Sequence, residues 1–190
     1  MHRVIPQRNY QVQDEKSLVQ RAQQRDQEAF AQLYEAYFDK IYRYVSLKIG
    51  NKTEAEDMTQ QVFLKALQSI SSFRWRGIPF SAWLFRIAHN QVVDYFRKKS
   101  KRVTVPIDNL PIMANDNPQL MAERRSDIEQ LVSATKQLTE AQREVISLRF
   151  AGELSIAQVA EIMGKKQGAV KALQHSAIAA LRRTLAVKEQ

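Results

Sequence analysis

The stretch that decides the fold is LSIAQVAEIMGKKQGAVKALQHSAIAALRR, residues 154–183. Ala160 is small, as a close crossing of two helices requires, and Gly164 follows four residues later. A tight turn between two helices requires a positive φ at such a position, which glycine adopts without strain. Val170 comes six residues after this glycine and is placed to fill the space between the helices. This spacing predicts a helix-turn-helix.

The second helix of this unit is predicted to have two chemically distinct sides. On a helical wheel, one side of residues 166–183 is apolar: Val170, Leu173, Ala177, Ala180 and Leu181. The opposite side, which we call the recognition face, carries Gln167, Lys171, Gln174, His175 and Arg182, and Lys165 and Lys166 directly precede it. Side chains of these types read base edges and phosphates in a major groove.

The alternative for this region is a plain helical hairpin with a solvated outer face. Two capping boxes, Thr139 with Gln142 and Ser155 with Gln158, begin helices where a helix-turn-helix needs them. They favour the DNA-reading interpretation. His175 is far in sequence from the other two histidines, so no metal site and no cofactor is expected.

Composition restricts the possible classes of protein. The 190 residues carry a net charge of +9, and most of the excess lies in residues 1–102, which hold +8. This distribution favours a polyanionic partner, although solubility alone also accounts for a basic chain. The chain has no cysteine, no apolar run long enough for a membrane helix and no apolar signal sequence. We therefore expect a soluble cytoplasmic protein without membrane insertion.

Helical periodicity covers most of the remaining chain and predicts an all-α protein with two small helical domains joined by a flexible linker. Helices are expected over 15–49, with a break near Asp26, over 53–71, opened by a capping box of Thr53 and Glu56, and over 80–99. Residues 103–125 contain three prolines and no helical period, as is typical of a linker. The predicted parts are a tail (1–13), a first domain (14–102), the linker (103–125) and the helix-turn-helix domain (126–190).

The segment RWRGIPFSAWLFRIAHNQVVDYFRKKSKR, residues 74–102, combines both tryptophans with a dense positive charge. On a wheel, Leu84, Ala88, Val92 and Tyr95 form a buried side, flanked by Phe85 and Phe96. The opposite side, which we call the basic stripe, consists of Trp83, Arg86, Asn90, Asp94, Arg97 and Lys101. Aromatic rings stack on unpaired bases, amides and carboxylates bond to base edges, and cations hold phosphates. The stripe predicts a single-strand platform; the alternative is that Trp83 packs under the 72–79 loop as a structural plug.

Three blocks in series resemble a known family. EAEDMTQQVFLKAL, FSAWLFRIAHNQVVDYFRKK and LTEAQREVISLRFAGELSIAQVAEIMGKKQGAVKALQHSAIAALRR are similar, in order and spacing, to sigma-70 family sigma factors of the extracytoplasmic-function (ECF) group. The resemblance covers about 15–102 and 126–186 and implies core RNA polymerase and promoter DNA, both duplex and single-stranded, as partners. It implies no enzymatic activity, and the chain contains no catalytic constellation or phosphate-binding loop.

The resemblance also implies a role for each block. The first block would bind the clamp of the polymerase β′ subunit through Asp57, Gln61, Phe63 and Lys65. The next would read the −10 element and hold its non-template strand, through Phe73, Trp75 and Arg76 in the loop and through the basic stripe with Lys98. The helix-turn-helix would read the −35 element and contact the β flap, and the linker would run toward the RNA exit path.

Two positions depart from the family pattern, which often has Glu at position 61 and Ser-Arg at 172–173. Gln61 and Ala172-Leu173 therefore predict one weaker clamp contact and one missing phosphate contact. An anti-sigma protein is a further candidate partner, because such proteins commonly cover the polymerase-binding surfaces of family members. The rival interpretations are a stand-alone helix-turn-helix regulator, which would not use a base-stacking platform, and an RNA-binding helical protein, which would not use a helix-turn-helix. An enzyme is a more distant alternative.

Overall fold

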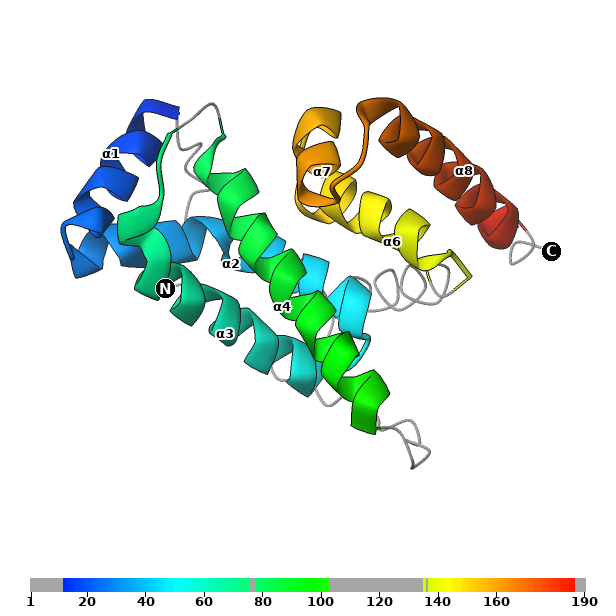
Figure 1. Ribbon diagram of the computed structural model, residues 1–190, viewed down its shortest axis with the longest axis horizontal. Helices are drawn as coiled ribbons and strands as arrows, with labels where there is room; N and C mark the ends of the chain where they lie inside the picture. The colour runs from blue at the N-terminus through cyan, green and yellow to red at the C-terminus, as the bar shows by residue number, and fades with distance from the viewer. Residues whose placement is uncertain (1–11, 76–77, 103–134, 136, 187–190) are drawn as a thin grey trace, which may run out of the picture.

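The computed structural model describes residues 12–75, 78–102, 135 and 137–186, and all regular secondary structure in them is helical (Figure 1). The N-terminal domain, residues 12–102, consists of α1 (Val12–Gln23), α2 (Gln27–Ile49), α3 (Lys52–Ser69), the short 3₁₀ helix η1 (Ile70–Ser72) and α4 (Phe80–Arg102). The C-terminal domain, residues 135–186, consists of α6 (Glu140–Ile146), the π-helical turn η2 (Ser147–Ala151), α7 (Ile156–Ile162) and α8 (Gln167–Ala186). The all-helical class and the two-domain organisation are confirmed.

Local sequence explains where the helices of the N-terminal domain begin and end. Asp26 caps α2 by accepting a hydrogen bond from the Ala29 backbone N–H at 3.1 Å, which is the break expected between the first two helices. Gly50 ends α2 with φ +73°, and Asn51 then caps α3. The predicted capping box of Thr53 and Glu56 is wrong, because the chain is already extended at Asn51 and α3 starts at Lys52.

The helices of the N-terminal domain surround a core that follows the predicted periodicity. The predicted inner positions of α1 and α2 are at most 6% exposed at Leu18, Ala22, Ala29, Leu33, Ile41 and Tyr44, whereas Tyr37 is half-buried. Ala55, Val62, Ala66 and Ile70 do the same for α3 and η1. On α4, Leu84, Phe85, Ala88 and Val92 are buried, and Tyr95 and Phe96 pack half-buried beside them. Since α4 buries this side, its other side carries the basic stripe.

The C-terminal domain contains the predicted helix-turn-helix, formed by α7 and α8. Both halves of the two predicted capping boxes are present, at Thr139 for α6 and at Ser155 for α7. Gly164 has φ +61°, and Ala160 and Val170 are 5% and 0% exposed, so each of the three residues that define the motif behaves as its spacing predicts. The π-helical turn η2 was not expected. A small second core of Leu138, Ile146 and Ala177 joins α6 to α8.

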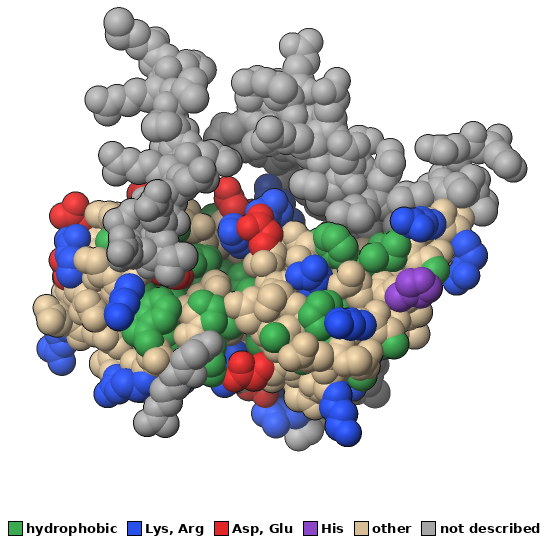
Figure 2. Space-filling model, turned by 90° about the horizontal axis from the view of Figure 1, so that it is seen from above, with side chains coloured by type: hydrophobic (Ala, Val, Ile, Leu, Met, Phe, Trp, Pro, Cys, Tyr) green, Lys and Arg blue, Asp and Glu red, His purple; other side chains and the backbone are tan. Residues whose placement is uncertain are grey.

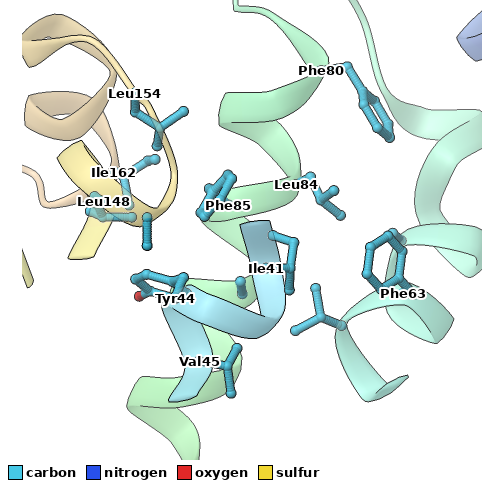
Figure 3. Close-up of a cluster of buried hydrophobic side chains, with 14 of the residues drawn as sticks. Ile41, Tyr44, Val45, Phe63, Phe80, Leu84, Phe85, Leu148, Leu154 and Ile162 are labelled. Atoms are coloured by element: carbon cyan, nitrogen blue, oxygen red, sulfur yellow. The ribbon is translucent and has the colours of Figure 1, made fainter. Parts of the chain in front are cut away.

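One continuous hydrophobic core includes residues of both domains. It joins α2 and α4 to η2, α7 and the Leu154 loop, so the domains pack directly against each other (Figures 1 and 3). None of the described helices has the length and apolar character that a membrane span requires.

Candidate nucleic-acid interface

The outer side of α3 presents the polar residues that the first block assigns to the clamp contact. Asp57, Gln61 and Lys65 are exposed, and Asp57, Gln60, Gln61 and Leu64 line a shallow hollow. Phe63 lies on the other side of the helix at 4% exposure, with its ring centroid 4.6 Å from that of Tyr34. Its place in the structure is the core, from which it supports the helix that carries the exposed residues.

Two leucines on the same outer side were missed by the sequence analysis. Leu64 is 56% exposed and Leu67 is 49% exposed, an unusual position for large apolar side chains. The sequence contains a signal for this exposure. Leu64 lies between the polar positions Gln61 and Lys65, and Leu67 lies one helical turn after Leu64, so both are placed away from the buried Val62 and Ala66. We call the set Asp57, Gln61, Leu64, Lys65 and Leu67 the α3 outer face.

The aromatic residues at the start of α4 form one packed group. Phe73 is 3% exposed, and its ring contacts those of Trp75, Phe80 and Trp83 at centroid distances of 5.2, 5.8 and 5.3 Å. Trp83 is half-buried against Phe73 and Phe80. The structure therefore brings Phe73 into the core, while each indole keeps part of its surface accessible. Trp83 both supports the loop, as the plug interpretation has it, and retains an accessible edge.

Trp75 has an additional feature. Its indole Nε1 is buried and makes no hydrogen bond with the described residues, although a buried indole N–H usually finds an acceptor. Arg76 lies outside the described residues, so the part-exposed residue of this loop that can carry the predicted base capture is Trp75, and the part-exposed Trp83 of α4 contacts the same Phe73 ring.

The lower part of the basic stripe is partly engaged in ion pairs. The Arg86 guanidinium (Nη2) lies 2.6 Å from Glu161 Oε1 of α7, and Arg97 Nη2 lies 3.0 Å from Asp94 Oδ1 one turn before it. Asn90 and Lys98 are exposed. Lys101 belongs to α4, but its side chain is not among those described. Asn90 and Lys98 are therefore directly available to a ligand, whereas Arg86 has a protein partner.

The recognition face of α8 is open. Lys165, Lys166, Gln167, Lys171, His175 and Arg182 are exposed, and Gln174 is half-buried. The apolar side packs inward, with Val170 and Ala177 both 0% exposed. Seen from above, the molecule carries Lys and Arg side chains across much of its length, with apolar side chains among them (Figure 2).

Arg149 of η2 positions one residue of the recognition face and was missed from the sequence. Its Nε donates to Oε1 of Gln174 at 2.9 Å, and its Nη1 donates to the Leu154 backbone oxygen. This side chain therefore ties η2 to the loop before α7 and to the middle of α8. No local pattern indicates the role, because it depends on a contact between residues 25 positions apart.

A buried carboxylate lies where the two domains meet. Glu144 of α6 contacts three side chains of the N-terminal domain: Lys48 Nζ at 2.6 Å, His89 Nδ1 at 2.8 Å and the Tyr44 hydroxyl, which donates at 2.7 Å. Burial by itself would raise the pKa of Glu144, but the His89 hydrogen bond and the charges of Lys48 and His89 lower that pKa to about 2. Burial and the adjacent carboxylate raise the pKa of Tyr44.

No cluster of three or more His, Cys, Asp or Glu side chains suited to a metal ion occurs among the described residues. The arrangement offers instead two surfaces suited to nucleic acid, one on α4 and one on α8, and a partly apolar surface on α3. These properties are typical of a helical protein that binds nucleic acid.

Comparison with known proteins identifies the family. Residues 33–102 match the family description Sigma-70 region 2, and residues 134–183 match Sigma-70, region 4. The chain therefore belongs to the sigma-70 family, as an ECF sigma factor, a non-enzymatic protein that directs RNA polymerase to promoters.

Two curated relatives support the assignment. The ECF RNA polymerase sigma factor BldN of Streptomyces coelicolor is 39% identical over 171 residues, which are 88% of this chain and 64% of that protein. The ECF RNA polymerase sigma factor SigW of Bacillus subtilis is 32% identical over 183 residues, covering 90% of this chain and 96% of that protein. The chain thus spans somewhat less than two thirds of BldN and nearly all of SigW.

Two solved structures have a similar fold. RpoE in complex with the anti-sigma factor NepR from Bartonella quintana matches with a TM-score of 0.70 and 26% identity, over 84% of this chain and 98% of that chain. CnrH in complex with the cytosolic domain of CnrY matches with a TM-score of 0.71 and 24% identity, over 91% and 97%. The second likeness concerns the fold alone.

Proposed function

We propose that this sigma factor divides promoter recognition between its two domains. The recognition face of α8 reads the −35 element as duplex, and the basic stripe holds the unpaired non-template strand of the −10 element. The observation that carries the proposal is that two separate surfaces with different chemistry lie on the two domains. One is a helix face of exposed amides, cations and a histidine, and the other combines two part-exposed indoles with an exposed amide and cations.

The chemistry of each surface suits its proposed ligand. Lys171, His175 and Gln167 point outward from a helix that follows a tight turn, the geometry that places side chains against base edges in a major groove. Trp83 and Trp75 offer indole surface on which a base can stack, a contact worth ~1–3 kcal/mol per base. The protein acts through binding energy, which offsets part of the cost of unpairing the promoter.

The α3 outer face is the proposed contact with the β′ clamp of core polymerase, and the C-terminal domain also contacts the β flap. Leu64 and Leu67 supply an exposed apolar centre, and Asp57, Gln61 and Lys65 supply polar groups around it. The domains assigned to these tasks are 14–102 and 126–190, with a tail at 1–13 and a linker at 103–125. The protein would work in the cytoplasm, where its polymerase partner acts.

An anti-sigma protein is a proposed regulatory partner. RpoE and CnrH, which resemble this chain in fold, are seen in complexes, one with the anti-sigma factor NepR and the other with the cytosolic domain of CnrY. The exposed leucines of α3 offer an apolar surface that such a partner can cover. Co-purification of the chain from its native cell, followed by mass spectrometry, tests this part of the proposal.

Run-off transcription tests the function as a whole. Core RNA polymerase is incubated with fragmented bacterial genomic DNA, with and without this protein. We expect discrete new transcripts that begin downstream of a shared pair of short sequence motifs. If no new transcripts appear and the protein does not co-purify with core polymerase, the proposal fails and a stand-alone helix-turn-helix regulator becomes the better account.

Promoter specificity is expected only in the holoenzyme. The predicted C-terminal domain, residues 126–190, carries a net charge of only +2, so phosphate contacts alone give weak binding at physiological salt. Footprinting of a promoter found by run-off transcription should show protection with polymerase present and none with the isolated chain. Tight protection by the isolated chain would contradict this expectation.

A further inference from the structure

One side chain of the recognition face is tied to another element of the C-terminal domain. Gln174 of α8 is half-buried, whereas Lys171, about one turn before it, and His175, directly after it, are exposed. The Gln174 amide oxygen Oε1 accepts a hydrogen bond from Nε of Arg149 at 2.9 Å. Arg149 belongs to the π-helical turn η2, outside the two helices of the helix-turn-helix. One residue of the recognition face therefore has a fixed partner elsewhere in the domain.

Arg149 is itself held at a second point. Its Nη1 donates to the backbone oxygen of Leu154, the residue before the N-cap Ser155 of α7. The adjacent residue Leu148 is 0% exposed, so η2 is anchored in the core directly beside Arg149. A planar guanidinium that is bound through two of its nitrogens has little freedom to rotate. Arg149 therefore holds the Gln174 amide in one orientation.

The helix that carries Gln174 is fixed as well. On the side of α6, Nε2 of Gln142 donates to Oγ of Ser176 at 3.0 Å, while Oε1 of Gln142 accepts from the Thr139 backbone N–H in the capping box. Ala177 is 0% exposed in the small core between α6 and α8. The position of α8 and the orientation of its Gln174 side chain are therefore both set by contacts within the domain.

The chemistry of the two groups decides which end of the amide Arg149 holds. A guanidinium N–H can only donate, and of the two ends of an amide only the oxygen accepts. The oxygen of Gln174 is thus engaged by Arg149, and the nitrogen Nε2 is the end that remains. Nε2 is not buried and makes no hydrogen bond with the described residues, so both of its N–H groups are available to a ligand.

A glutamine held in this way suits a different base from a free glutamine. A free glutamine uses both ends of its amide, and its preferred partner in a major groove is adenine, which offers N6–H₂ to the oxygen and N7 to the nitrogen. With its oxygen engaged, Gln174 offers mainly donors. Guanine presents two acceptors, N7 and O6, on the same edge. The bond from Arg149 therefore makes guanine a better partner than adenine.

We propose that Arg149 is a positioning residue for promoter recognition and that, by engaging the oxygen of Gln174, it makes this glutamine a reader of guanine at one position of the −35 element. Arg149 acts through Gln174 and contacts no base itself. The inference rests on the proposed function, because it assigns a base to one side chain of the recognition face. The sequence of α8 alone would assign adenine to a glutamine at this position.

Base preference in the holoenzyme tests this assignment. A promoter found by run-off transcription is prepared with each of the four base pairs at each position of its −35 element, and holoenzyme binding to each is measured. In the wild-type protein we expect one position at which guanine is preferred over adenine by about tenfold. Gln174→Ala should remove the preference at that position and leave the preferences at the other positions unchanged.

Two further substitutions should change the preferred base rather than abolish the preference. Arg149→Ala frees the amide oxygen of Gln174, so the preferred base at that position should change from guanine to adenine. Gln174→Glu keeps an acceptor for Arg149 but offers only oxygens to DNA, so the preferred base should become cytosine, whose N4 amino group donates. A residue that only stabilised the fold would lower binding to all four bases alike. Circular dichroism confirms that each variant is folded.

A double-mutant cycle separates positioning from a direct contact with DNA. Because Arg149 acts through Gln174, Arg149→Ala should have no effect on base preference in a chain that already carries Gln174→Ala. Lys171→Ala is the matched control, since it also removes one cation from the domain and should weaken binding to all sequences roughly equally.

The outcomes separate this inference from the proposed function. An unchanged preference in Arg149→Ala, or an equal loss of binding to all four bases, would overturn the positioning role while recognition of the −35 element stands. A change of preference by Arg149→Ala that persists in the Gln174→Ala background would assign the DNA contact to Arg149 itself and would also overturn it. If the wild-type holoenzyme binds every variant of the −35 element equally, the proposed function fails, and this inference fails with it.

Discussion

The two candidate DNA surfaces differ in how far the rest of the protein occupies them. The recognition face of α8 is exposed over most of its length, and one of its residues, Gln174, is held in place by Arg149. The basic stripe of α4 is partly engaged: Trp83 packs on Phe80 and Arg86 pairs with Glu161, while Asn90 is exposed. The surface that we propose for duplex DNA is therefore accessible without any rearrangement. In its proposed role the basic stripe would exchange the Arg86–Glu161 pair for contacts with an unpaired strand, whereas the recognition face needs no such exchange.

The largest expected effect comes from Phe85, because both domains pack on it. Phe85→Ala removes a ring that is 0% exposed and should lower the free energy of unfolding by ~3–5 kcal/mol. Thermal unfolding followed by circular dichroism measures this. Val93→Ala on the same helix, where the side chain is 46% exposed, should have little effect. Equal losses for the two variants would show that α4 does not join the domains as described.

The next effect concerns strand capture alone. Trp83→Ala should weaken promoter opening by ~1–3 kcal/mol, the value of one stacked base, while leaving binding to a −35 duplex unchanged. Permanganate reactivity of unpaired thymines in the holoenzyme complex measures opening. Trp83→Phe retains a ring at that position and should recover part of the loss. If Trp83→Ala weakens duplex binding just as strongly, the division between the two surfaces is wrong.

The recognition face is tested through its salt dependence. Lys171→Ala should weaken holoenzyme binding to promoters roughly uniformly across sequences and reduce the slope of log K against log salt by about one. Lys16→Ala removes an exposed cation from α1 and should leave the slope unchanged. A slope that is the same for Lys171→Ala and wild type would exclude a phosphate contact at this position.

The smallest effect is expected from pH near neutrality. The pKa of Glu144 is lowered to about 2 from its ordinary 4.5, so the stability that its charge contributes is fully present above pH 4.5 and is lost as pH falls toward 2. The groups around it are Lys48 and Tyr44 on α2, His89 on α4 and Glu140 at the start of α6. The contribution of the Glu144 charge to the free energy of unfolding should therefore stay constant from pH 8 to about pH 5 and fall below that, as acid unfolding followed by circular dichroism measures. E144Q should not show the acid-dependent fall attributable to this group.

Much of the fold was predictable because it depends on local sequence. The turn at Gly164, the capping boxes at Thr139 and Ser155 and the buried side of α4 follow from backbone preferences and from helical periodicity. The error at the start of α3 has a local cause as well. Asn51 competes with Thr53 as a helix cap, and the turn at Gly50 decides in favour of the residue that directly follows it.

The side of the helix that carries each candidate site could be predicted from the sequence, but the contacts of its residues with distant parts of the chain could not. A wheel places Arg86 on the outer side of α4, yet nothing near it in sequence indicates that Glu161, 75 residues away, is its partner. The burial of Phe73 was missed for the same reason, because its neighbours Phe80 and Trp83 become neighbours only after the loop folds back. The burial of Glu144 has one sequence signal. It lies one helical turn before Leu148, which is buried, and this spacing places both side chains on the same side of the helix.

The measurement that tests the central claim most directly compares two variants of the holoenzyme, Trp83→Ala and Lys171→Ala, on one promoter. Permanganate reactivity of unpaired thymines measures opening, and footprinting of the −35 duplex measures binding. Trp83→Ala should reduce opening while duplex binding stays unchanged, whereas Lys171→Ala should reduce duplex binding. Equal losses in both assays for both variants would contradict the account.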